Sequence, residues 1–214
     1  PYIVLLAAAS RISGLPLKWT EDRLEHLMAS SSAADRADEL EAAFTSDGTL
    51  LGLRFKNCVN VGAYVRAPEP ASVYRMHAAS NGCYAVKNIS IQNKLVSTNK
   101  MPVGLNRGYG GPQFYYGLER MMDLTARKLN IDTAEIRRKN FIPEDQFPYH
   151  APAGAIYDSG NYSEALDLLL KLSNYENIKR RRKQARAAGK LFGIGMGAGV
   201  EPSGSNMAYV TLAQ

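Results

Sequence analysis

The chain has 214 residues, of which 45% are hydrophobic and 21% are charged, and its formal net charge is +6. Its length and composition are those of an ordinary globular protein of one or two domains. The apolar run Ile3–Ser10 is too short to span a bilayer and lacks the basic lead and cleavage pattern of a secretion signal. We therefore expect no membrane insertion and no export, and a cytoplasmic protein.

The excess of positive charge comes from one stretch near the C-terminal end, and the rest of the chain is nearly balanced. No aromatic side chains interleave with these cations to stack on bases, so we expect a solvated helix or a subunit contact and no nucleic-acid binding. The cations are Lys179, Arg180, Arg181, Arg182, Lys183, Arg186 and Lys190.

The pattern of elements predicts an α+β fold with mixed sheets and hairpins in the N-terminal half. Helices are expected from about Pro112, and the chain is expected to return to strand after Lys190. We place residues 1–190 in one α+β domain and residues 191–214 at the start of a following β-containing segment.

The N-terminal half begins with a helix predicted over Tyr2–Ile12, which stops at Gly14. Between Glu39 and Tyr64, two apolar runs flank Ser46-Asp47-Gly48. This pattern predicts a β-hairpin, because glycine can adopt the positive φ that such a turn needs. Val73–Thr98 is expected to form short strands and loops.

The two cysteines, Cys58 and Cys83, fit neither a disulfide framework nor a metal or iron–sulfur spacing. We expect two buried thiols in a reducing compartment. No set of residues in the chain resembles the ligands of a zinc or iron site.

A tight turn precedes the predicted helices and combines Arg107 with Gly108, Gly110 and Gly111, followed by Pro112. The glycines permit positive φ or a close approach to the backbone, and proline is preorganised for the first helical turn. Free amides at the helix start and the Arg107 guanidinium would together suit an anion or an oxo group. A tight loop with a solvated arginine fits the same pattern.

Apolar side chains then recur at three- and four-residue spacing as far as Asn130, which predicts one long helix with a core-facing stripe. The stripe consists of Phe114, Tyr115, Leu118, Met121, Met122, Thr125 and Leu129.

Two shorter helices are predicted by signals that resemble capping boxes. Asp132 is followed three residues later by Glu135, and Asn161 by Glu164. The second of these helices precedes the basic one. Between the helix that follows Asp132 and the helix that follows Asn161, Asp145–Gly160 is a long connector that we expect to pack across the surface.

The segment Gly193–Gly199 superficially resembles a phosphate-binding loop. Val200–Gly204, which follows it, cannot open a helix, so the strand-turn-helix context of such a loop is missing. We expect a glycine-rich extended strand that packs closely on a neighbour.

Several strings in the chain, in the same order, resemble the molybdenum-cofactor subunit of the xanthine dehydrogenase, aldehyde oxidase and aerobic carbon monoxide dehydrogenase family. The resemblance covers nearly the whole chain. Its pieces include KWTEDRLEHLMAS (18–30), GCY (82–84), RGYGGPQ (107–113), ERMMD (119–123), EIRRKNFI (135–142) and YDSGNY (157–162).

The resemblance implies roles for four residues. It places the backbone of Arg107 beside the molybdenum centre, in a loop that Gly108 shapes. It places Tyr109 on the substrate ring, with a buried aromatic under the loop as the alternative. Arg75 would face the substrate and stabilise developing negative charge; the alternative is a strand arginine paired to a surface carboxylate. No side-chain metal ligand is implied, and the glutamate general base lies outside these residues.

The resemblance also implies chemistry and partners. Its members hydroxylate an N-heterocycle such as xanthine, or an aldehyde, with water as the oxygen source. The implied cofactor is molybdenum-molybdopterin, in the cytosine dinucleotide form if the protein is bacterial. Electrons would pass to [2Fe-2S] centres and FAD on an iron–sulfur subunit and a flavin subunit, in a complex that is a dimer as a whole.

Carbon monoxide oxidation is disfavoured, because the specialised carbon monoxide enzymes of this family carry a copper-bridging cysteine in the glycine turn. No cysteine follows Cys83 in this sequence.

We expect the chain to be a fragment truncated at both ends, in which the strand-like Met207–Ala213 has no visible partner. It would then need the rest of its own large subunit and be inactive alone. The alternative function is a noncatalytic structural or assembly module of the same family.

Overall fold

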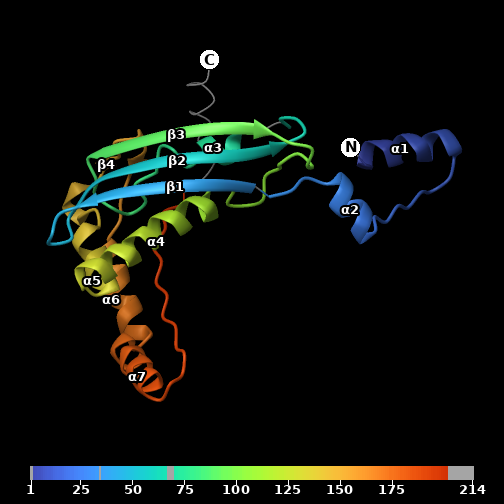
Figure 1. Ribbon diagram of the computed structural model, residues 1–214. Coiled ribbons are helices and arrows are strands. Elements are labelled where there is room, and N and C mark those ends of the chain that lie inside the picture. Colours follow the sequence, from blue (N-terminus) through green and yellow to red (C-terminus); the bar gives the residue numbers. More distant parts are fainter. Residues whose placement is uncertain (1, 34, 67–69, 202–214) are drawn as a thin grey trace.

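The computed structural model describes residues 2–33, 35–66 and 70–201. Figure 1 shows a sheet with helices on one side and two helical extensions. The helices are α1 (Tyr2–Ser13), α2 (Arg23–Ala29), α3 (Ala71–Tyr74), α4 (Gly111–Leu129), α5 (Thr133–Asn140), α6 (Tyr162–Leu172) and α7 (Tyr175–Ala187), with a 3-10 turn η1 (Glu144–Gln146). The strands are β1 (Asp35–Phe44), β2 (Leu50–Gly62), β3 (Asn88–Ser97), β4 (Tyr149–His150) and β5 (Ile156–Tyr157).

The main sheet has the order β1-β2-β3, with β1 antiparallel and β3 parallel to β2. The predicted hairpin is confirmed, since β1 and β2 flank the expected turn and Gly48 has a φ of +87°. A Cβ at this position would also lie 2.8 Å from Ile131 Cδ1, so the end of that side chain would have to move.

One face of the sheet packs on the core, because alternate residues of β2 point inward: Leu53, Phe55, Asn57 and Val59 are buried. Helix α4 covers this face, where the Phe55 and Phe114 rings stack with centroids 4.6 Å apart. The same alternation places Cys58 on the exposed face, so the expectation of two buried thiols was wrong for Cys58 and right for Cys83. The alternation of side chains along β2, rather than the chemistry of cysteine, leaves the Cys58 thiol exposed.

The expectation of short strands and loops over Val73–Thr98 was only partly right. Val73 belongs to α3, turns continue to Cys83, and Tyr84 forms an isolated bridge to Phe141 before β3 begins. The rest is one strand of ten residues, β3, whose parallel pairing with β2 extends over its whole length. The crossover places these two strands side by side, a long-range pairing that local sequence does not reveal.

The helical half follows the sequence pattern closely. Helix α4 buries Phe114, Leu118 and Met122 from the predicted stripe and ends at Asn130 in the left-handed region, with a φ of 55°. Asp132 and Asn161 cap α5 and α6 by accepting backbone N–H bonds, as predicted. Six of the seven basic residues lie on α7 and Lys190 follows it; the helix buries only Tyr175 and is otherwise largely exposed.

The connector 145–160 packs on the body as expected, since Ala151 and Tyr157 are buried and the Tyr157 hydroxyl donates to the Gly82 carbonyl at 2.9 Å. None of the helices in the described part has the length and apolar character needed to cross a bilayer.

The expected return to strand after Lys190 is found as an extended chain without strand pairing, within the described residues 191–201. Its residues alternate between exposed glycines and half-buried apolar side chains, and the latter pack against the core: Ile194, Met196, Ala198 and Val200. Its backbone bonds to side chains of the body instead of a neighbouring strand, which explains the difference. The predicted strand Met207–Ala213 lies outside the described residues.

Candidate functional site

The glycine turn lies at the start of α4, where the chain reverses over residues 107–110. Gly108 and Gly110 have φ values of +80° and +81°, in the region that favours glycine. The Gly111 amide donates to the Gly108 carbonyl at 3.0 Å, and the Phe114 amide donates to the Gly110 carbonyl at 3.2 Å. The turn is therefore built from the first hydrogen bonds of α4.

The two positive-φ glycines face different surroundings. A Cβ at Gly110 would lie 2.5 Å from the Ser72 carbonyl oxygen of α3, so this glycine lets the turn pack against that helix. A Cβ at Gly108 would meet nothing within 4 Å. The backbone at Gly108 is thus open to approach from outside, and the adjacent Arg107 is exposed.

The packing of α3 on the turn brings Arg75 and Tyr109 together. Arg75, the residue that ends α3, donates from Nη1 to the Tyr109 carbonyl at 3.1 Å. Its guanidinium carbon lies 4.8 Å from the centroid of the Tyr109 ring. This is the stacking arrangement of a cation on an aromatic face.

A third residue completes this cluster from far along the chain. Glu201, at the end of the glycine-rich extended segment, forms an ion pair with Arg75 through Nη2 and Oε1. Glu201 Oε2 would lie 3.3 Å from a Cβ at Gly111, so the glycine turn also makes room for this carboxylate.

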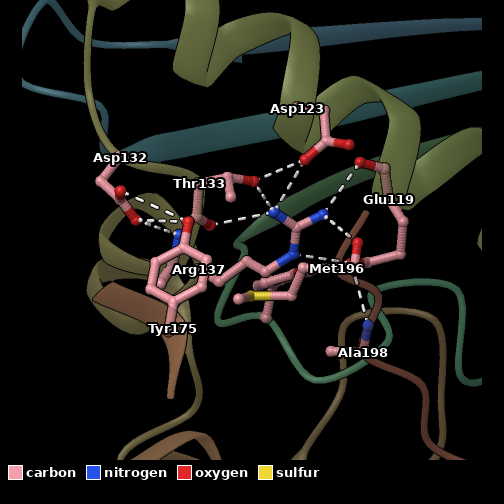
Figure 2. Close-up of polar contacts among 10 residues, drawn as sticks. Glu119, Asp123, Asp132, Thr133, Arg137, Tyr175, Met196 and Ala198 are labelled. Carbon is pink, nitrogen blue, oxygen red and sulfur yellow. Dashed lines mark hydrogen bonds and ion pairs between the residues drawn. The ribbon is translucent and has the colours of Figure 1, made fainter. Parts of the chain in front are cut away.

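A buried ionic network, drawn in Figure 2, joins α4 and α5 to the extended segment 191–201. Arg137 of α5, whose side chain is 0% exposed, donates from Nε to Glu119 at 2.8 Å and from Nη1 to Asp123 at 3.0 Å. Arg137 Nη2 donates to the Met196 carbonyl at 3.0 Å, and Glu119 accepts the Ala198 amide at 2.9 Å.

The surroundings shift the pKa of two groups in this network, Arg137 and Tyr84. Burial is the largest single effect and acts to lower the pKa of Arg137, but the neighbouring Glu119, Tyr84 and Asp123 together raise that pKa above its ordinary value. Burial raises the pKa of Tyr84, and the neighbouring Cys83 and Glu119 add to the rise. The Tyr84 phenol therefore stays protonated and donates to Glu119 at 2.5 Å. Glu119 thus binds α5, the Tyr84 loop and the extended segment at once.

The four residues named from the sequence occupy one region, the turn and the helix packed on it. Arg107 and Gly108 lie on its open side, and Arg75 and Tyr109 contact each other. Arg75 is not on a strand, and its carboxylate partner is Glu201. The sequence reasoning missed Glu201, Glu119 and Arg137. Glu119 and Arg137 lie within the strings ERMMD and EIRRKNFI, but no local pattern signals that they are buried.

Among the described residues, no three His, Cys, Asp or Glu side chains cluster in a way that could hold a metal ion. A group bound at the turn would instead meet backbone at Gly108 and the Arg107 cation. These suit a polar, anionic organic cofactor better than a bare ion.

Comparison with known proteins places the chain in a family. Residues 1–141 match the molybdopterin cofactor-binding domain. The chain is 34% identical over 209 residues to the large subunit of nicotine 6-hydroxylase from Paenarthrobacter nicotinovorans, covering 96% of this chain and 25% of that protein. It is 37% identical over 203 residues to the carbon monoxide dehydrogenase large chain of Hydrogenophaga pseudoflava, covering 92% and 25%.

Among solved structures, quinoline 2-oxidoreductase from Pseudomonas putida 86 matches with a TM-score of 0.78 and 32% identity, over 87% of this chain and 24% of that one. The fold is similar to that of a cofactor-binding region within these longer proteins. The chain belongs to the molybdopterin cofactor-binding domain family, and its relatives include a carbon monoxide dehydrogenase large chain, a probable xanthine dehydrogenase subunit and an aldehyde oxidoreductase. It spans about a quarter of the length of these relatives.

Proposed function

We propose that the subunit containing this chain is a molybdenum-dependent hydroxylase of an N-heterocycle or an aldehyde, with water as the oxygen source. The observation that carries the proposal is the glycine turn, held by α3 and α4, with an open backbone at Gly108 in a chain of the cofactor-binding family. Two relatives, named for nicotine and for carbon monoxide, show that the family acts on chemically different substrates.

In this proposal the turn residues bind and orient. The Arg107 cation and the Gly108 backbone would hold the molybdenum-molybdopterin cofactor, in its cytosine dinucleotide form if the protein is bacterial. The cofactor supplies the two-electron oxidation of a substrate carbon when it is bound. Tyr109 presents an aromatic ring to the substrate, and a planar heterocycle would stack on it. The general base is expected outside this chain.

Electrons would leave through [2Fe-2S] and flavin groups on partner subunits. The names of relatives support such an assembly, since they are called a large subunit, a large chain and a complex subunit gamma. We further propose that the whole complex is a dimer and that it lies in the cytoplasm. Within this chain, we propose that residues 1–190 form one domain and that a β-containing segment follows it. Carbon monoxide stays disfavoured, because no cysteine follows Cys83.

The test is the cofactor content of the complete subunit, purified with its partners. We expect stoichiometric molybdenum and extractable fluorescent pterin in the unaltered protein. Gly108→Leu should lower both, because a branched side chain would occupy the open approach. Gly154→Leu is the matched control, since Gly154 also has positive φ and open surroundings but lies in the β4–β5 hairpin. A folded complex without molybdenum and pterin would contradict the proposal and favour the noncatalytic module.

A further inference from the structure

The Arg75 cation beside Tyr109 is not free to meet a ligand. Its side chain is only 14% exposed, against 52% for that of its ion-pair partner Glu201. One edge of the guanidinium donates to the Tyr109 carbonyl, its face lies over the Tyr109 ring, and Nη2 contacts the carboxylate. The hydrogen-bonding edges that an anionic ligand would use are therefore already engaged.

The position of Glu201 is set by the body of the protein. The extended segment that carries it is bound through the Ala198 amide and through the Val200 carbonyl, which accepts the Tyr115 hydroxyl. Because apolar residues of this segment alternate inward with glycines outward, its register is fixed up to Val200. Glu201 follows directly and reaches the turn in the space that Gly111 leaves open.

The pair changes the charge of the surface next to Tyr109. An arginine alone would attract carboxylates and other anions, whereas an arginine with a close carboxylate has no net charge. The more exposed member of the pair is the carboxylate, so an approaching anion would first meet negative charge. An uncharged aromatic ring has no such penalty and gains contact with the Tyr109 ring.

We propose that Glu201 is a specificity-determining residue: it neutralises Arg75, so that the surface beside Tyr109 accepts uncharged aromatic rings and rejects aromatic carboxylates. This inference rests on the proposed function, because it names the substrate class of that site. It also assigns a role to the glycine-rich segment, which delivers the carboxylate.

The test compares two ligands of nearly equal shape and different charge. Pyridine-3-carboxamide and pyridine-3-carboxylate are titrated by calorimetry at neutral pH into the complete subunit with its partners. We expect the unaltered protein to bind the carboxamide at least about tenfold more tightly, the factor expected from one unfavourable charge contact. Glu201→Gln keeps a hydrogen-bonding side chain but removes the charge. It should raise carboxylate affinity at least about tenfold and leave carboxamide affinity unchanged.

Glu176→Gln is the matched control, because Glu176 also pairs with a cation, Lys179, but lies on α7. It should behave as the unaltered protein does. Glu201→Ala should shift the preference in the same direction as Glu201→Gln, and thermal melting checks that each variant is folded.

Equal binding of both ligands by the unaltered protein, no binding of either, or an unchanged preference in both folded Glu201 variants would overturn the inference. Molybdenum and pterin are assayed in the same samples. Loss of the cofactor with an intact charge preference would overturn the proposed function and leave the charge selectivity standing. A subunit that holds molybdenum and pterin but shows no preference for the carboxamide would overturn this inference and leave the proposed function standing.

Discussion

At the scale of single residues, Arg137 carries the most consequential charge, because it is fully buried between Glu119 and Asp123. Arg137→Met removes the cation and leaves the buried Glu119 carboxylate with its neutral donors Tyr84 and Ala198 but without a positive charge beside it. We expect the free energy of unfolding to fall by about 3–5 kcal/mol, as measured by chemical denaturation.

The neighbouring Arg138 provides the control for this prediction. Its side chain is 30% exposed and pairs with Asp167 at 2.5 Å on the surface, so Arg138→Met should cost about 1 kcal/mol or less. Adding Glu119→Gln to Arg137→Met should restore part of the loss, because the unpaired charge is removed. A cost for Arg137→Met no larger than that for Arg138→Met would show that the buried pair contributes little.

A second residue-scale prediction concerns His77, whose Nε2 lies 2.7 Å from the side-chain amide nitrogen Nδ2 of Asn93. Burial lowers the pKa of His77 below its ordinary value of 6.5, and the charge of Arg36 lowers it further against an opposing effect of Asn93. The unfolded chain therefore binds a proton at a higher pH than the folded chain does. This contribution to stability is present above pH 6.5 and is lost as the pH falls through that value towards the folded pKa.

The slope of stability with pH from this one group is at most about 1.4 kcal/mol per pH unit. His77→Gln should flatten the stability profile just below pH 6.5, and denaturation at a series of pH values measures it. His150→Gln, at an exposed position in β4, is the control. If His77→Gln loses stability with acid as steeply as the unaltered protein, His77 is not the titrating group.

Sequence reasoning at this scale found residues that belong to a recognisable string and missed residues that act through long-range contacts. Arg107, Gly108 and Tyr109 lie in the turn, and Arg75 was found by spacing. Glu201 could not be found, because it meets Arg75 across 126 residues and no periodicity links them. Cys58 was misplaced because thiol burial was judged from redox chemistry instead of strand alternation.

At the scale of elements, the glycine turn depends on where each glycine points. Gly110→Ala would force an L residue into a positive φ and bring its Cβ against the Ser72 carbonyl. We expect a loss of about 3 kcal/mol or more, from backbone strain and overpacking together. Gly154→Ala has the strain without the contact and should cost about 1 kcal/mol. Thermal unfolding measures the loss of stability in both variants. Equal losses would contradict the prediction, because they would show that α3 moves to accommodate the added methyl group.

Elements with their own local signals were the ones that could be predicted. The β1–β2 turn has Asp47-Gly48, α4 has an apolar stripe, and α5 and α6 have polar caps. The strand β3 and the short helix α3 have weaker signals, because their conformation is decided by pairing with β2 and by packing under the turn. The segment 191–201 was recognised as extended, but its binding to Arg137 and Glu119 requires the assembled core.

At the scale of the whole molecule, stability should be uneven. The sheet, α4 and α5 share one core, whereas α1 has no buried residue and extends from the body together with α2 (Figure 1). Apolar side chains are strongly exposed on this arm, among them Ile3, Val4, Ile12, Leu24 and Met28. An apolar surface of this kind usually marks a contact with other protein.

The arm leads to a prediction for hydrogen exchange measured by mass spectrometry. In the 214-residue chain, the amides of α1 should exchange at least about a hundredfold faster than the core amides of α4, because a helix of this length without tertiary packing is marginal in water. In the complete subunit, α1 should become protected, since its apolar residues would be covered there. Amides of β2 serve as the reference in both samples. Slow exchange of α1 in the 214-residue chain would contradict this prediction, because it would show that α1 is stable without a covering surface.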